Sequence, residues 1–97
     1  MALARRGSKS IEVGGIRYRW AVSQDSGYKV IVVQSDAGAG QKLEASTSYR
    51  NDSSQLAIRP SDVRAVIEAA LAGGWAPDQR GAPPFVMRDV DRTVFGR

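Results

Sequence analysis

The chain has 97 residues, of which 42% are apolar and 25% are charged, and its formal net charge is +4. It contains no cysteine and no histidine, which excludes disulfides, thiolate chemistry, imidazole or thiolate metal sites, and Ser-His or Cys-His catalysis within the chain. A chain of this length supports one hydrophobic core. We therefore expect a single small domain that is not an enzyme.

Carboxylates are the remaining candidates for a metal site. The aspartates at 25, 36, 52, 62 and 78 are scattered singly, and no stretch matches a calcium-binding loop or a phosphate-binding glycine motif. We therefore expect no metal ion, no cofactor and no catalytic residue.

The basic charge lies at the two ends of the chain. Residues 1–9 hold three basic side chains and no acid, residues 88–97 hold three basic and two acidic ones, and residues 10–87 hold eight of each. We therefore expect a basic N-terminal arm at 1–9, one α+β domain at 10–87 and a C-terminal tail at 88–97. No apolar segment follows Arg5 and Arg6, and no stretch approaches the roughly 18 apolar residues of a membrane span. This pattern favours a cytoplasmic protein without a membrane partner.

The first structural signal is a Gly-Gly pair at 14–15 between two alternating runs. Two glycines suit a two-residue hairpin turn, in which both central residues have positive φ. Pairing Val13 with Ile16 puts Glu12 opposite Arg17, and it assigns the inner face to alternate apolar residues of both strands. These inner residues are Ile11, Val13, Ile16, Tyr18, Trp20 and Val22.

Two further turn signals predict a third and a fourth strand. Asp25-Ser26-Gly27 suits a three-residue hairpin, which pairs Trp20 with Val32 and turns Val30 and Val32 inward. The glycine-rich segment at 37–40 then pairs Asp36 with Gln41. That pairing puts Leu43, Ala45, Thr47 and Tyr49 on the inner face and Lys42, Glu44, Ser46 and Ser48 on the outer face.

The segment 60–73 has the spacing of an amphipathic helix. Pro60 suits the first helical position, Asp62 suits the first turn, and Gly73 or Gly74 suits the C-cap. Its apolar residues recur at i, i+3, i+4, i+7 and i+8, which predicts one buried face. The stripe consists of Val63, Val66, Ile67, Ala70 and Leu71.

These elements predict the fold class and the core. We expect an α+β domain: an antiparallel β-meander of three to five strands with one α-helix packed on one face. A short fifth strand can follow at 85–88. Trp75, just after the helix, is expected to fold back onto it instead of forming a ligand platform. The predicted core contains Tyr18, Trp20, Val22, Val30, Val32, Leu43, Val66, Ile67, Leu71 and Trp75.

Parts of this pattern resemble a group of small bacterial proteins. The matching residues are Tyr18-x-Trp20-x-Val22, Pro60-x-x-Val63, Ala70-Leu71 and Gly74-Trp75-Ala76-Pro77. With them the chain resembles small uncharacterised bacterial proteins of the integron-cassette type, in which a strand meander precedes one helix ending in Gly-Trp-x-Pro. The resemblance implies a cytosolic accessory protein and transfers no activity.

The outer face of the predicted sheet is the candidate partner-binding surface. In the predicted register Ile31 and Val33 lie outward, framed by Arg17, Arg19 and Glu44. A solvated outer face is normally more polar than this. The alternatives are that the segment around Phe85, Val86 and Val90 covers this face, or that β-propensity alone explains Ile31 and Val33.

Three functions remain open at this stage. The first is a non-catalytic accessory module that binds another protein or a second copy of itself. The second is a nucleic-acid accessory protein that makes phosphate contacts through its basic terminal arms. The third is small-ligand binding between helix and sheet.

Overall fold

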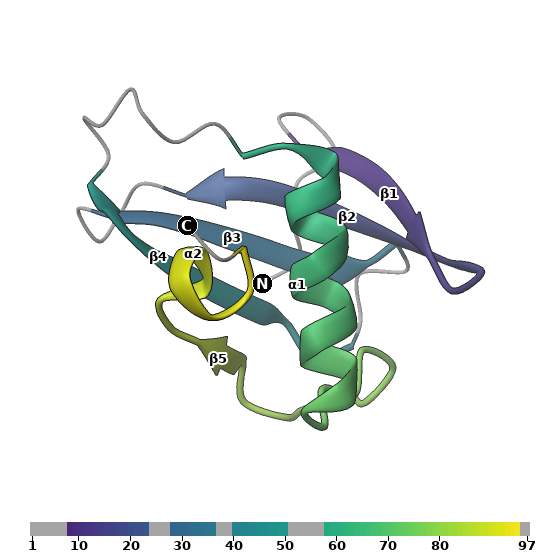
Figure 1. Ribbon diagram of the computed structural model, residues 1–97. Helices are drawn as coiled ribbons and strands as arrows, with labels where there is room; N and C mark the ends of the chain where they lie inside the picture. The colour runs from purple at the N-terminus through teal and green to yellow at the C-terminus, as the bar shows by residue number, and fades with distance from the viewer. Residues whose placement is uncertain (1–7, 24–27, 37–39, 51–57, 96–97) are drawn as a thin grey trace.

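The computed structural model describes residues 8–23, 28–36, 40–50 and 58–95. Five strands form one sheet in the order β1-β2-β3-β4-β5, and their bounds are β1 (Lys9–Val13), β2 (Ile16–Ser23), β3 (Tyr28–Ser35), β4 (Leu43–Arg50) and β5 (Phe85–Met87). The helices are α1 (Pro60–Ala72) and α2 (Val90–Thr93). Both helices lie on the same face of the sheet (Figure 1). The predicted α+β class, with a helix on one face of a mostly antiparallel sheet, is confirmed.

The β1–β2 hairpin has the predicted turn and register. Gly14 and Gly15 have φ of 61° and 81°, and Val13 pairs with Ile16 and Glu12 with Arg17. Tyr18 and Trp20 are buried on the inner face, while Arg17 is exposed on the outer face. The alternation of the sequence therefore determines the two faces of this hairpin.

The predicted register of β3 is wrong by one residue. Trp20 pairs with Val33 instead of Val32, and Leu43 pairs with the same Val33. Because side chains alternate along a strand, this slip turns Ile31 and Val33 into the core, where neither has exposed surface, and turns Val30 and Val32 outward. The turn predicted at 24–27 and most of the one at 37–40 lie outside the described residues.

The inner face of β4 is as predicted. The pairing of β3 is shifted by one residue against both β2 and β4, and the two shifts compensate for β4. Leu43, Ala45 and Thr47 are buried, and Glu44 and Ser46 lie on the outer side. β5 adds a parallel pair to the meander, with Leu43 opposite Phe85. The parallel direction follows from α1, which carries the chain back along the sheet between β4 and β5.

Helix α1 begins and ends with the predicted residues. Pro60 occupies the first position, and the carboxylate of Asp62 accepts a hydrogen bond from the backbone N–H of Arg59 at 3.0 Å. At the other end Gly74 has φ of 108°, Gly74 N–H donates to Leu71 and Trp75 N–H donates to Ala70. This pair of bonds is a Schellman motif, and it turns Trp75 back into the core.

The core differs from the predicted set at its margins. Val63, Val66, Ile67 and Ala70 are fully buried, but Leu71 is 38% exposed because it lies at the edge of the helical stripe. Val90, which sequence analysis placed in the C-terminal tail, has no exposed surface and belongs to the core cluster. The C-terminal segment therefore covers the inner face beside α1, and Val86 on the outer face remains 54% exposed.

Candidate functional site

The outer face of the sheet holds three of the five predicted partner-binding residues. Arg17, Arg19 and Glu44 lie there, whereas Ile31 and Val33 are buried on the opposite side and cannot contact a partner in the folded chain. The physical reason is the composition of β3. Residues 30–33 are all branched and apolar, so either face of this strand can be buried and alternation does not choose between them.

Arg19 is committed to contacts within the chain. Its guanidinium donates to the hydroxyl of Ser8 at 2.9 Å and to the carbonyl of Ser8 at 3.3 Å, and it forms an ion pair with Asp36 at 3.6 Å. Gln34, directly opposite Arg19 on β3, is 5% exposed. Arg19 and Gln34 are therefore less available to a partner than the exposed Arg17.

A continuous row of outward side chains crosses four strands of the outer face. Ala21 pairs with Val32, Val32 with Glu44, and Glu44 with Val86. Val30 lies on the same outer side of β3, two residues before Val32, and is half-buried. Ala21, Val30, Val32, Glu44 and Val86 are hereafter called the outer row. It is an apolar surface interrupted by one carboxylate.

Arg17 and Glu44 carry opposite charges on this face. Among the residues that the structure describes, neither has an ion-pair partner, and the ion pairs that form there are Arg19–Asp36, Arg59–Asp62 and Arg64–Glu68. Arg17 is exposed and Glu44 is half-buried. Glu12, which lies opposite Arg17, is also exposed, so the face offers a partner charges of both signs.

The two outermost strands, β1 and β5, carry features that disfavour pairing with another chain. At the β1 edge the ammonium of Lys9 lies over the ring of Trp20, 5.4 Å from its centroid, so a charge points inward beside the edge. β5 has three residues, follows Pro83 and Pro84, and is followed by Asp89 with φ of 52°. Short edges with prolines and inward charges disfavour strand addition.

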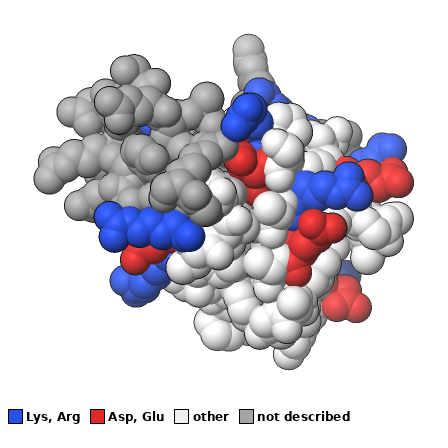
Figure 2. Space-filling view, viewed as in Figure 1, with Lys and Arg blue, Asp and Glu red and all other residues white. Residues whose placement is uncertain are grey.

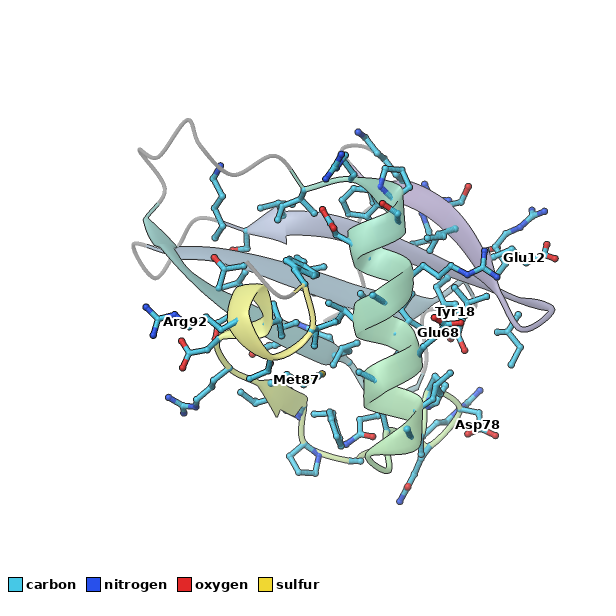
Figure 3. The ribbon with its side chains drawn as sticks, viewed as in Figure 1. Glu12, Tyr18, Glu68, Asp78, Met87 and Arg92 are labelled. Atoms are coloured by element: carbon cyan, nitrogen blue, oxygen red, sulfur yellow. The ribbon has the colours of Figure 1, made fainter. Side chains whose placement is uncertain are left out.

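A second feature lies between α1 and the β1–β2 hairpin. Tyr18 has no exposed surface, and its hydroxyl has no hydrogen-bond partner among the described residues. Its ring packs against Trp75 with centroids 5.5 Å apart. Burial, and secondarily the carboxylate of Asp78, raise the pKa of Tyr18 above its ordinary value of 10.0. Figure 3 places Tyr18 and Asp78 on the same flank of α1.

Sequence reasoning missed the unpaired hydroxyl of Tyr18 near Asp78, and it missed the hydrogen bonds that Gln41 makes. The side chain of Gln41 donates to the carbonyl of Pro83 at 2.9 Å and accepts from the N–H of Ala76 at 3.0 Å. Its main-chain carbonyl accepts the indole N–H of Trp75 at 3.0 Å. Residues 34 or more positions apart meet here only through the tertiary fold, and no local pattern in the sequence indicates these contacts.

In the described part of the chain no three Asp or Glu side chains come together in a way that could hold a metal ion. Neither described helix has the length and apolar composition needed to cross a bilayer. Acidic and basic side chains are interspersed on the helix-bearing side, without a large area of one sign (Figure 2).

Comparisons with known proteins add no relative: no family model, no curated protein and no solved structure matches the chain. The resemblance to integron-cassette proteins stays a prediction.

Proposed function

We propose that the protein is a non-catalytic module that associates with a second copy of itself through the outer face of its sheet. The observation that supports this most directly is the outer row, in which Val86 is 54% exposed and Val32 lies in mid-sheet. Apolar side chains in mid-sheet normally lie under another layer. In the described part of the chain, both helices lie on the other face and neither covers this one.

The charges on the face favour a second copy as that partner. In a two-fold dimer, residue i of one copy contacts residue j of the other and the reverse contact follows. Arg17 of each copy can then meet Glu44 of the other, which satisfies two charges that are unpaired among the described residues. The body of the chain, with eight basic and eight acidic residues at 10–87, has no net charge to repel a copy.

The size of the face is compatible with a small dimer. Three of its strands have eight residues, which corresponds to about 27 Å, and five strands about 4.8 Å apart span about 20 Å. The projected area is therefore on the order of 500 Å², and the accessible area of the side chains is larger. Standard interfaces bury about 800 Å² per partner, so the dimer must use most of the face.

The nucleic-acid alternative has less support. The rings of Tyr18 and Trp20 lie in the core while Arg17 and Arg19 lie outside, so these aromatics offer no stacking surface beside the cations. Phosphate contacts would therefore depend on the terminal arms, of which the N-terminal one lies largely outside the described residues.

Sedimentation velocity over about a hundredfold range of concentration tests the proposal, since association must rise with concentration. We expect the native chain to approach twice the monomer mass and Val86→Lys to remain a monomer. Ile16→Lys is the matched control, because Ile16 is also a large exposed apolar residue but lies at the hairpin tip on the inner side. A native chain that stays monomeric throughout the range contradicts the proposal.

Charge reversal tests the pairing within the dimer. Arg17→Glu and Glu44→Arg should each weaken association, because each creates a like-charge contact, and the double variant should restore it. Double-variant association no stronger than that of the single variants would rule out the Arg17–Glu44 contact.

A further inference from the structure

The hydroxyl of Tyr18 is the buried polar group for which the described fold offers no partner. Buried hydroxyls almost always make a hydrogen bond, and one that does not destabilises the fold that contains it. Phenylalanine would fill the same position without that unpaired group. The presence of tyrosine therefore points to a role for the hydroxyl outside the packing of the isolated chain.

The carboxylates of Glu68 and Asp78 lie on the same side of α1 as Tyr18 (Figure 3), and Glu68 forms an ion pair with Arg64. Asp78 is exposed and has no ion-pair partner among the described residues, yet it is close enough to affect the titration of Tyr18. A tyrosine hydroxyl can accept one hydrogen bond while it donates another, and a carboxylate accepts only. A group that binds both must therefore donate hydrogen bonds, and a positive charge on it is favoured by Asp78.

Two of the three large exposed apolar residues belong to the elements that flank Tyr18. Ile16 lies two residues from Tyr18 on the same face of β2 and is 50% exposed. Leu71 lies about one helical turn after Glu68. Figure 3 shows Glu68 on the side of α1 where Tyr18 of β2 lies. Apolar surface beside a carboxylate suits an aliphatic stem that ends in a cation.

We propose that Tyr18 and Asp78 bind an ammonium group at the end of an aliphatic chain, such as a lysine side chain of a partner protein. The ammonium donates one hydrogen bond to the Asp78 carboxylate and one to the Tyr18 hydroxyl. The aliphatic stem packs between Ile16 and Leu71, and the Trp75 ring beside Tyr18 adds a face that attracts cations. The site is separate from the outer face, so it does not depend on the proposed dimer.

Access to the hydroxyl requires a local movement, because Tyr18 has no exposed surface. One backbone hydrogen bond closes the turn that carries Asp78, from the N–H of Gln79 to the carbonyl of Ala76 at 3.0 Å, and residues 78–81 are exposed. An outward shift of this turn admits the ammonium while the contacts of Gln41 with Trp75 and Ala76 remain. Binding should therefore perturb the turn and leave the sheet unchanged.

The experiment is a titration of the full chain with n-butylammonium, followed by NMR of the Tyr18 ring and the Trp75 indole N–H. We expect saturable shifts at both groups, and none with n-butanol, which has the same stem without the charge. Asp78→Asn should weaken binding by about tenfold or more, as expected for loss of a charge-assisted bond. Asp89→Asn, which changes an exposed aspartate elsewhere, is the control and should leave binding unchanged.

Tyr18→Phe separates the hydroxyl from the ring. The variant keeps the packing against Trp75, so its folding can be verified by the shift dispersion of the same spectra, and its affinity for n-butylammonium should fall severalfold. The proposal is overturned if butylammonium gives no saturable shift, if butanol binds equally well, or if Asp78→Asn or a folded Tyr18→Phe binds as tightly as the native chain.

Discussion

The indole N–H of Trp75 donates to the main-chain carbonyl of Gln41 at 3.0 Å, and the two residues are 34 positions apart in sequence. The Gln41 side chain adds one bond to Ala76 and one to Pro83. One residue just before β4 thereby holds two points of the segment between α1 and β5. That segment carries Asp78 and contributes Trp75 to the core.

Replacement of Gln41 by alanine should therefore loosen this segment. The variant loses both side-chain bonds and leaves the partly buried N–H of Ala76 unpaired, so we expect the free energy of unfolding to fall by about 1 to 3 kcal/mol in urea titrations. Gln79→Ala, at an exposed position, is the control and should change it by less than about 0.5 kcal/mol. Equal effects of the two variants would contradict the role of Gln41.

Gly40 should tolerate no side chain. A Cβ there would overlap the carbonyl group of Pro77 and come within 3.1 Å of the Cα of Asp78, and all of these atoms belong to the backbone. Gly40→Ala should therefore lower the free energy of unfolding by about 3 kcal/mol or prevent folding. Gly73→Ala is the control, because its nearest atoms lie at 3.4 Å and its φ is −88°. Thermal melts of both variants decide the matter, and similar melting temperatures would refute the contact.

Ile67 and Leu71 should differ in their contribution to stability, although both belong to the predicted apolar stripe. Ile67 is fully buried, so Ile67→Ala should cost about 2 to 5 kcal/mol. Leu71 is 38% exposed, and Leu71→Ala should cost less than about 1.5 kcal/mol because less apolar area is lost. Urea denaturation of the two variants measures the difference. A larger loss for Leu71→Ala would mean that α1 is rotated about its axis.

Tyr18 should make stability depend on pH in the alkaline range. Burial, with Asp78 as the second cause, raises its pKa in the folded state, so the folded chain holds the phenol proton more tightly than the unfolded chain does. The associated stability is complete below pH 10 and is lost as the pH rises through the folded pKa. Tyr18→Phe should show a smaller loss above pH 10 and equal or greater stability at neutral pH. A parallel alkaline profile for both proteins would contradict the burial of the hydroxyl.

The contrast between β2 and β3 explains how far the sequence predicts the fold. Tyr18, Arg19 and Trp20 alternate apolar and charged side chains, so the faces of β2 follow from the sequence. Residues 30–33 of β3 carry no polar side chain, and the register there depends on packing against Trp20 and Leu43. The predicted pairing of β3 is wrong by one residue against both β2 and β4, so Val33 replaces Val32 in the core while the faces of β2 and β4 are as predicted.

The candidate sites differ in the same way. The outer face and its charges at Arg17 and Glu44 follow from the alternation of β2 and β4, whereas the apolar residues between them depend on the register of β3. The Tyr18–Asp78 feature joins β2 to a turn 60 residues later, and nothing local in the sequence indicates that the hydroxyl lacks a partner. The burial of Val90 likewise depends on where β5 directs the chain.

The most direct test of the account is the pair Val32→Arg and Val33→Arg, with the melting curve and the mass in solution measured for each. Val33 has no exposed surface, so Val33→Arg should unfold the chain, because an arginine there places an unpaired charge in the core. Val32 faces outward, so Val32→Arg should melt close to the native chain and remain a monomer where the native chain dimerises. If Val32→Arg unfolds while Val33→Arg folds, the register of β3 is wrong; if Val32→Arg folds and keeps the dimer mass, the outer face is not the interface.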